Sequence, residues 1–572
     1  MNKPEATGAE DSDFNIKNFF ASPVRDDSND RFALLMTEAI KGINSLKPIS
    51  GNSSAFLGEN PELTVTRDKA QKAVLKPEGE SFTDVLNHII STFEGLPNWG
   101  HPLNMSNICP QENYGALAAS MLTQLFSPNI LEAEYAWNTS IAELESSAML
   151  ADLAGWDAGK AGGIFTYGGS GCWMYQLKYA LSRVLPGSRE RGIRTDAKVL
   201  CSEQAHYAML NSTDWTGLGI DNLIKIKTLP DTNTMDIAHL EQVLKDCFDR
   251  KIPVASVVCT MASTDACAFD PVQAVRKLLD RYPNDDQYGK TLLYCDAVIG
   301  WSWLAFKDYD FAANPQNFPE SVLEPAQKNC RAIQEIQYAD AFGVDFHKNF
   351  SPLVSSVFMY RDRSEFEILL KRESSAYLQE RGDYNPHHYT LEVSRSAGGS
   401  MAAWATLKFL GARGIRSVLA HGLRNKHYML QQLEPYPDMT CVNRADHGAV
   451  LLLRIYPEDT DAALQYTQEL HDEAFRNRLI EHNTFIEKIS DRLWKWFREK
   501  RQIDGKFTPY LSITKGFRPA MYNLNASDPE AVIYALKVYP VSTYITRADM
   551  RHAIRCIRLA RNEVVEDLAI QV

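Results

Sequence analysis

The chain has 572 residues and a mass of 64.5 kDa, which exceeds the size of one compact core and predicts two or three domains. Its 72 acidic and 60 basic side chains give a net charge of −12, so we expect no nucleic-acid partner. The longest mostly apolar stretch, 116–126, is shorter than the ~18 residues of a membrane span, and the polar N-terminus is unlike a secretory signal. Ten scattered cysteines without a CxxC pair predict reduced thiols, a cytoplasmic location and no metal site.

The first 110 residues are predicted to form an α-rich segment. Residues 1–30 are acidic and polar, and we expect a loose arm there. Apolar residues recur at helix spacing from about residue 31, and a second helical stretch covers 81–93.

Residues 111–414 are predicted to form the large domain, because short apolar or β-branched runs alternate there with helical stretches. The expected strands are 198–202, 223–229, 254–260 and 291–298, with helices at 237–249 and 272–281. This alternation predicts an α/β fold with a parallel sheet, whose chemistry collects where the strands end.

Residues 415–572 are predicted to form a smaller α+β domain. They contain an expected strand at 449–456, a long charged helix at 462–500 and a final helix at 546–569.

Two segments that follow predicted strands could bind a ligand. The glycine-rich run at 167–171 precedes a helix at 173–184, and such a turn lets an anion approach backbone amides, with the Ser170 hydroxyl as a further donor. An ordinary turn is the alternative. His206 follows the strand 198–202, where a histidine is either functional or structural.

Two further segments offer a carboxylate and an amine. Asp296 closes a mostly apolar strand, where a buried carboxylate needs a cationic partner, and a simple salt bridge is the alternative. Lys348 follows another apolar run. A lysine in apolar surroundings is nucleophilic and suits Schiff-base formation, whereas a solvated lysine is inert.

Taken in order, the segments GGSG, SEQAH, TMASTDACAFDP, CDAVIG and DFHK resemble the signatures of the group II pyridoxal-phosphate-dependent amino-acid decarboxylases. The similarity runs from about Asn98 to the C-terminus and includes 394–414. It implies fold type I, a mostly parallel seven-stranded sheet flanked by helices, and pyridoxal 5'-phosphate as the cofactor. It also implies decarboxylation of an L-amino acid to an amine in a homodimer whose active sites lie at the subunit interface.

The resemblance also implies roles for individual residues. Lys348 would form the Schiff base, Asp296 would pair with the pyridine nitrogen, and His206 would stack on the ring near the scissile carboxylate. The remaining cofactor contacts that it implies are Gly169, Ser170 and Ser355 at the phosphate, with Thr264 and His347 nearby.

A mobile loop, expected within 372–392, would supply across the interface a tyrosine that protonates the carbon left by CO2 loss. Tyr384 fits this role best and Tyr389 is the alternative. We expect the adjacent His387 and His388 to shape this loop rather than bind a metal.

Three departures from the family pattern bear on the substrate. Gly171 replaces a frequent glutamate, the stretch 301–344 is long enough for an added subdomain or a substrate-side loop, and Lys537 stands where relatives usually carry arginine. Trp99, His101 and Asn104 are further candidates for the substrate wall. Aromatic residues at 99–104 and 301–311 would suit an apolar or aromatic substrate or would form core, whereas Lys537 or an arginine of the other chain would suit an acidic substrate.

Two other functions stay open at this point. Relatives on the same scaffold form aldehydes by decarboxylation with deamination, or act as carbon–carbon lyases. A catalytically inactive binding homologue is the third reading, and the presence of Lys348, Asp296 and His206 argues against it.

Overall fold

The computed structural model describes residues 31–59, 67–108, 111–351, 354–374, 376, 378–444, 448–523 and 527–570. The chain divides into two compact units, Met1–Asn98 and Trp99–Val572. The expected loose arm, 1–30, lies outside the described residues. The domain boundaries expected near 110 and 414 stay predictions, and the second of them falls inside one long helix, α14 (Gly398–Leu433), near Gly411, where the backbone leaves helical geometry.

The first unit is helical, with α1 (Arg31–Ser45), α2 (Arg67–Ala70) and α3 (Phe82–Ser91). Ser81 caps α3, because its hydroxyl accepts a hydrogen bond from the backbone N–H of Asp84. A Cβ on Gly42 would lie 2.2 Å from Cδ1 of Ile90, so α1 and α3 pack closely at this glycine.

The second unit is built on a seven-stranded sheet with the strand order β1-β7-β6-β5-β4-β2-β3. The pairs β2–β3, β2–β4, β4–β5 and β5–β6 are parallel, and β7 runs antiparallel to both of its neighbours. This confirms the expected α/β fold with a mostly parallel sheet. The strands are β1 (Gly162–Thr166), β2 (Lys198–Ser202), β3 (Leu223–Ile226), β4 (Val254–Thr260), β5 (Leu292–Asp296), β6 (Ala341–Asp345) and β7 (Ser356–Tyr360).

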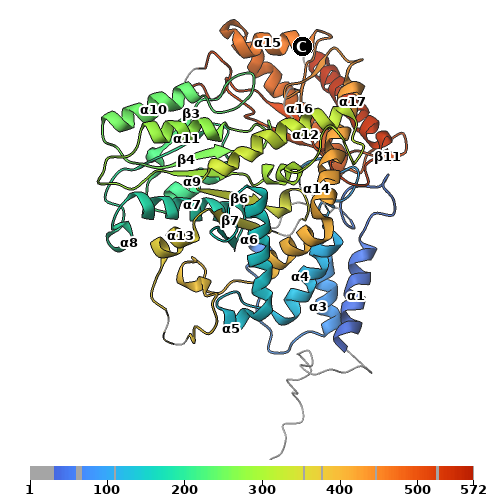
Figure 1. The fold of residues 1–572 in the computed structure, drawn as a ribbon. Helices are drawn as coiled ribbons and strands as arrows, with labels where there is room; N and C mark the ends of the chain where they lie inside the picture. The colour runs from blue at the N-terminus through green and yellow to red at the C-terminus, as the bar shows by residue number, and fades with distance from the viewer. Residues whose placement is uncertain are drawn as a thin grey trace, which may run out of the picture. The chain divides into compact units, whose positions relative to one another are not determined.

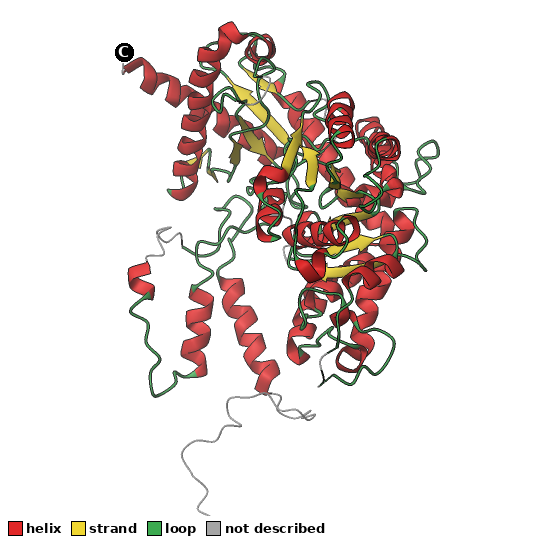
Figure 2. Cartoon of the chain, turned by 90° about the vertical axis from the view of Figure 1, so that its left-hand side faces the viewer, coloured by secondary structure: helices red, strands yellow, loops and turns green. Residues whose placement is uncertain are grey.

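Helices cover both faces of this sheet because its strands are apolar on both sides. Successive residues alternate between the faces, so Val257 of β4 belongs to one buried cluster and Val258 to the other. In Figure 1, α10 (Ile237–Asp249) and α11 (Val272–Arg281) lie on one side of β4, with α7 (Gly169–Val184) and α9 (Ala208–Trp215) on the other. The yellow strands between red helices in Figure 2 show the same layering.

The remaining helices of this domain connect and flank the strands. They are α4 (Tyr114–Phe126), α5 (Ala133–Ala136), η2 (Trp137–Ser140), α6 (Ile141–Leu153), α8 (Ser188–Arg191), η3 (Ile220–Asn222), η4 (Gly300–Phe306), α12 (Glu320–Ile333), η5 (Gln334–Tyr338), η6 (Phe346–Lys348), α13 (Arg363–Leu370) and η7 (Pro386–His388). None of the helices in the described part of the chain combines the length and apolar character that crossing a membrane requires.

The long stretch 301–344 consists of most of the connection from β5 to β6 and the first residues of β6. Most of its aromatic residues are buried and pack on one another, and the Arg416 guanidinium of α14 lies 5.8 Å from the ring centre of Phe306 and 5.2 Å from that of Tyr309. Trp301, Trp303 and Phe306 belong to the main core of the sheet. The aromatic residues at 301–311 therefore form core.

The C-terminal part has a four-stranded antiparallel sheet in the order β12-β13-β9-β8 and a two-stranded one, β10-β11. The strands are β8 (Met439–Cys441), β9 (Leu451–Ile455), β10 (Gln502–Ile503), β11 (Lys506–Phe507), β12 (Ser512–Thr514) and β13 (Ala535–Val538). The helices are α15 (Ala462–His471), η8 (Glu473–Phe475), α16 (Arg476–Arg498) and α17 (Arg547–Ile570).

The single helix expected over 462–500 is wrong, because the chain breaks it at Asp472. This residue has an extended backbone, and its carboxylate accepts a hydrogen bond from the N–H of Ala474, which starts η8. Aspartate competes with helical hydrogen bonds in this way, so it ends α15 and starts the next turn.

Candidate active site

The carboxyl ends of three neighbouring parallel strands bring polar side chains to one edge of the sheet. Asp296 ends β5 and is in register with Thr260, the last residue of β4, and with Gly343 of β6. Asp345 ends β6, and Lys348 follows it in the short helix η6. In parallel sheets ligands bind at this edge, so the topology gathers the predicted residues where a site is expected.

Asp296 is buried and only half satisfied. The indole Nε1 of Trp173 donates a 2.9 Å hydrogen bond to its Oδ2, whereas Oδ1 is buried and has no hydrogen-bond partner among the described residues. Burial raises the pKa of Asp296, and the Trp173 hydrogen bond, His206 and Lys348 act in the opposite direction. A buried carboxylate oxygen of this kind is suited to a cationic or N–H group of a ligand.

His206 and Lys348 belong to the same electrostatic cluster. Burial lowers the pKa of His206, Asp296 raises it, and Lys348 lowers it further. The Nδ1 atom of His206 accepts a 3.2 Å hydrogen bond from the N–H of Ala208, so the neutral ring carries its proton on Nε2. The lowered pKa favours this neutral form.

His347 and Asp345 form a second pair beside Lys348. His347 Nε2 lies 3.3 Å from Asp345 Oδ2, and the Ser356 hydroxyl donates a 2.5 Å hydrogen bond to Oδ1. Burial raises the pKa of Asp345 to about 7, and burial together with Lys348 lowers the pKa of His347 to about 4. Neither Asp345 nor Trp173 was predicted as a site residue from the sequence. Asp345 could have been found, because it closes an apolar strand just as Asp296 does.

The glycine-rich run starts α7. Gly168 precedes the helix with φ 115°, a conformation that favours glycine, and it offers no side-chain cap. The N–H of Gly171 donates a 2.8 Å hydrogen bond to the carbonyl of Gly168, so the N–H groups of Gly169 and Ser170 are the ones that the start of the helix offers to a ligand. A Cβ on Gly169 would lie 3.2 Å from Asp345 Oδ2, which places this turn beside the polar cluster. The Ser170 side chain is exposed.

The glycine at position 171 is dictated by packing. A Cβ there would lie 2.2 Å from Oγ1 of Thr166, so the site has no room for the glutamate of other sequences without a shift of β1.

Thr264 and Ser355, the other expected cofactor contacts, make hydrogen bonds to other parts of the chain. Thr264 is exposed in the loop after β4, and its carbonyl accepts a 3.1 Å hydrogen bond from the Tyr539 hydroxyl. The buried Ser355 hydroxyl donates a 2.7 Å hydrogen bond to the carbonyl of Gly399, so in this arrangement it offers a ligand only its lone pairs.

Tyr384 lies away from this cluster within its own chain. It lines a groove of about 720 Å³ together with Gly162 and Tyr360, at the end of β1 and β7 opposite to Asp345. Its hydroxyl donates a 2.5 Å hydrogen bond to Oε1 of Glu143. Tyr389 lines the same groove.

Glu143 joins Tyr384 to Arg395. The two terminal nitrogens of Arg395 each donate a 2.8 Å hydrogen bond to the Glu143 carboxylate, and both side chains are buried. A buried, bidentate pair of this kind fixes the groove wall on which Tyr384 rests.

Most of the residues that we expected to bear on the substrate already have partners within the chain. Lys537 Nζ lies 2.6 Å from Asp265 Oδ1, and the Thr514 hydroxyl donates a 2.7 Å hydrogen bond to Oδ2. The buried His101 and Asn104 accept hydrogen bonds from the backbone N–H groups of Leu103 and Ser106. Trp99 is partly buried.

Known proteins with similar sequences point to one family. Residues 67–310 match the family described as pyridoxal-dependent decarboxylase conserved domain. L-2,4-diaminobutyrate decarboxylase of Acinetobacter baumannii is 22% identical over 383 residues, which cover 63% of this chain and 68% of that protein. Acidic amino acid decarboxylase GADL1 of Bos taurus is 23% identical over 362 residues, which cover 61% of this chain and 62% of that protein.

Solved structures share the fold. Mouse CSAD in apo form has a TM-score of 0.72 at 17% identity and covers 93% of this chain and 99% of its own. Oryza sativa TDC with PLP and tryptamine has a TM-score of 0.73 at 14% identity and covers 95% and 100%. The fold of this chain, with its mostly parallel seven-stranded sheet, is therefore that of these two structures. Over residues 67–310 the sequence is similar to the pyridoxal-dependent decarboxylase family.

Proposed function

We propose that this protein removes CO2 from an L-amino acid and releases the corresponding amine, with pyridoxal 5'-phosphate as cofactor. The observation that carries the proposal is Oδ1 of Asp296, which lies in the same cluster as Lys348 and His206 and is buried without a hydrogen-bond partner in the described part of the chain. A carboxylate oxygen that is buried without a partner fits the protonated pyridine nitrogen of this cofactor. When bound, the cofactor accepts the electron pair that the departing CO2 leaves on the substrate.

The chain offers groups for each part of the cofactor. Lys348 supplies the amine that attaches it, and Asp296 holds its ring nitrogen. The first turn of α7, with Gly169 and Ser170, offers backbone amides and a hydroxyl to the phosphate, because a helix N-terminus favours an anion. Trp173 fixes the orientation of the Asp296 carboxylate through its hydrogen bond.

His206 is proposed to lie on the face of the cofactor ring, next to the substrate carboxylate that is lost. Its neutral imidazole, with the proton on Nε2, can donate a hydrogen bond there without adding a buried charge. Asp345 and His347 are proposed to position Lys348, because they form the polar wall on its N-terminal side.

Tyr384 is proposed to donate a proton to the substrate carbon of a second copy of the chain in a homodimer. Two facts support this: Tyr384 lines a groove at the end of β1 and β7 opposite to Asp345, and the loop that carries it is exposed at Arg381 and Asp383. A donor in this loop can serve a site only if another copy approaches it.

The substrate is proposed to have a side chain without a second carboxylate. Lys537 is the cation that would recognise such a group, but Asp265 already neutralises it at 2.6 Å. Replacing Asp265→Asn would release Lys537, and we expect kcat/KM for glutamate or aspartate to rise about tenfold relative to neutral amino acids, the value of one charge-assisted hydrogen bond. An unchanged ratio would remove Lys537 from substrate selection.

The reaction is tested by reconstitution with the cofactor. Borohydride treatment of the loaded protein, followed by peptide mass analysis, should place the cofactor on Lys348 and on no other lysine. Lys348→Ala should lose both the cofactor absorbance and amine formation. Release of aldehyde, ammonia and peroxide in place of amine would instead assign the aldehyde-forming reaction, and failure to bind the cofactor would refute the proposal.

A further inference from the structure

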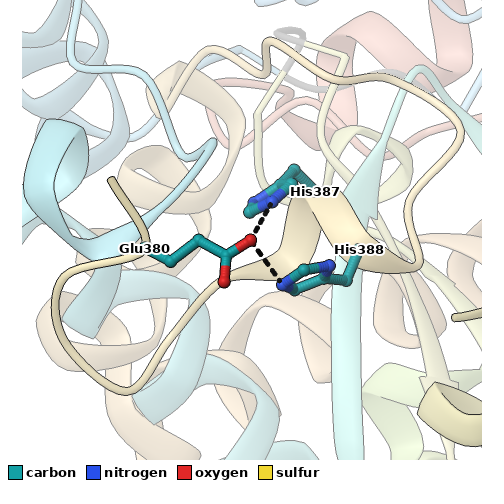
Figure 3. A group of neighbouring side chains, drawn as sticks. All are labelled: Glu380, His387 and His388. Carbon is teal, nitrogen blue, oxygen red and sulfur yellow. Dashed lines mark ion pairs between the residues drawn. The ribbon is translucent and has the colours of Figure 1, made fainter. Parts of the chain in front are cut away.

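A cluster of three ligating side chains lies in the loop that carries Tyr384. Glu380, His387 and His388 present one ligand atom each, and these three atoms lie within 4.8 Å of one another (Figure 3). His388 Nε2 is 3.5 Å and His387 Nε2 is 4.0 Å from Oε1 of Glu380. The described part of the chain offers no second group of three such side chains.

The hydrogen bonds of the two histidines determine which ring nitrogens face the carboxylate. His387 Nδ1 lies 3.2 Å from the carbonyl oxygen of Leu131, and His388 Nδ1 lies 3.2 Å from that of Arg372. Because a carbonyl oxygen only accepts hydrogen bonds, each Nδ1 must carry a proton and donate. In the neutral rings the lone pairs are therefore on Nε2, aimed at the carboxylate.

This arrangement needs a cation at its centre. Two lone pairs and a carboxylate oxygen repel one another unless a proton or a metal ion lies between them. The Ser374 hydroxyl lies 3.3 Å from His387 Nε2 and is also hydrogen-bonded to Glu380, so its single proton satisfies one of these groups at a time.

We propose that Glu380, His387 and His388 bind one divalent transition-metal ion of the Zn²⁺ type. Two imidazoles and a carboxylate are ligands that Zn²⁺ takes at about 2.0–2.2 Å, which corresponds to ligand atoms about 3.5 Å apart in a tetrahedral site. The two histidine-to-glutamate distances are 3.5 and 4.0 Å and all three ligand atoms lie within 4.8 Å of one another, so side-chain rotations of about 1 Å would close the site. A Nδ1–H donated to a backbone carbonyl is also the usual outer contact of a metal-binding histidine.

The backbone holds the three ligands in place. The N–H of Arg372 donates a 2.8 Å hydrogen bond to the carbonyl of His388, and the N–H of Glu380 donates a 3.1 Å bond to the Glu132 carboxylate. The ion would join Glu380 to His387 and His388 across Tyr384, so it would close the turn that presents this tyrosine. The site departs from the expectation that these histidines only shape the loop.

The test uses the full chain loaded with pyridoxal 5'-phosphate, freed of metal with a chelator, and titrated with Zn²⁺ by calorimetry and with Co²⁺ by visible absorbance. We expect one Zn²⁺ per chain and Co²⁺ ligand-field bands. His388→Ala and Glu380→Gln should weaken Zn²⁺ binding by at least about 100-fold, since losing even an outer partner costs 10- to 100-fold. His471→Ala, which removes an exposed histidine of α15, should bind like the wild type.

Each variant is compared with the wild type in cofactor absorbance and in unfolding temperature without metal, so that misfolding is recognised. Both substituted side chains are at least partly exposed, which favours folded variants. The absence of a Zn²⁺ or Co²⁺ site in the wild type would overturn the proposal and leave an ion pair of protonated histidine with Glu380. Equal binding by the wild type, His388→Ala and Glu380→Gln would overturn it as well.

Discussion

The indole of Trp173 donates a 2.9 Å hydrogen bond to one oxygen of Asp296, and the other oxygen is buried without a hydrogen-bond partner among the described residues. Trp173 lies in the second turn of α7, so the helix whose N-terminus we propose to bind the phosphate also orients the carboxylate that we propose to bind the cofactor ring. One helix thereby fixes the distance between two parts of the proposed cofactor site.

Trp173→Phe should weaken cofactor binding about tenfold or more. The substitution keeps an aromatic ring but removes a hydrogen bond to a charged group, which contributes about 1.5–3 kcal/mol. Absorbance titration with pyridoxal 5'-phosphate measures the effect. Trp303→Phe is the control, because Trp303 is a buried tryptophan that stacks on Phe306 in the core. If the two variants bound the cofactor with equal affinity, Trp173 would not be needed to orient the Asp296 carboxylate.

Gly171→Ala should destabilise the fold by about 1–3 kcal/mol, the usual cost of overpacking, because the new Cβ would lie 2.2 Å from Thr166 Oγ1. Denaturant unfolding measures the loss. Combining it with Thr166→Ala should restore part of the stability, since the obstructing atoms are removed. Gly516→Ala is the matched control, as no atom of the described residues beyond its chain neighbours lies within 4 Å of its Cβ position. If Gly171→Ala left the free energy of unfolding unchanged, β1 would have to shift without cost.

Tyr384→Phe should lower amine formation by about 100-fold or more, as expected for loss of a proton donor, while Tyr389→Phe changes it little. Both variants lose one buried hydroxyl and should lose similar stability, about 1 kcal/mol, which thermal unfolding can verify. The opposite ranking of the two activities would assign the role to Tyr389.

Mixing chains tests whether Tyr384 acts across an interface. A dimer of one Tyr384→Phe chain and one Lys348→Ala chain holds one site with both groups intact. Random exchange of the two inactive variants should therefore restore roughly a quarter of wild-type activity. If the mixture stays inactive although exchange is verified by mass, Tyr384 does not serve the other subunit.

The buried carboxyl of Asp270 should make the stability of the folded protein depend on pH. Burial raises the pKa of this carboxyl from 3.8 to about 7, although the N–H groups of Thr260 and Met235 donate to it. A folded pKa above the unfolded value means that the folded chain binds more protons, so this contribution is complete below pH 3.8 and is lost as pH rises through about 7. In Asp270→Asn, the unfolding temperature should fall less steeply between pH 4 and pH 7 than it does in the wild type. Parallel curves would exclude Asp270 as the titrating group.

The sheet was predictable because its strands are buried on both faces and read as continuous apolar runs. Residues 254–260 form β4 at the expected positions, and 237–249 form α10, whose buried Leu240, Leu244 and Cys247 recur at helix spacing. Strand order in a parallel sheet then brings Asp296 and Lys348 to one edge. Local periodicity and one topological rule were enough for this part.

Pairings between distant segments were not predictable from local patterns. The Tyr384–Glu143 hydrogen bond joins residues 241 positions apart, and neither position carries a periodic signal. From the sequence, the aromatic residues after β5 could equally form core or a substrate wall. The structure decides for core, because Arg416 packs on them. Likewise, neighbouring His387 and His388 point to one carboxylate only because two separate carbonyls orient their rings.

The most direct test of the proposed reaction is to incubate the cofactor-loaded protein with each common L-amino acid and to measure CO2 release and product mass together. We predict CO2 and amine in equal amounts from at least one amino acid, and neither from Lys348→Ala. CO2 with aldehyde in place of amine, or no CO2 from any amino acid while the cofactor is bound, would contradict the proposed decarboxylase.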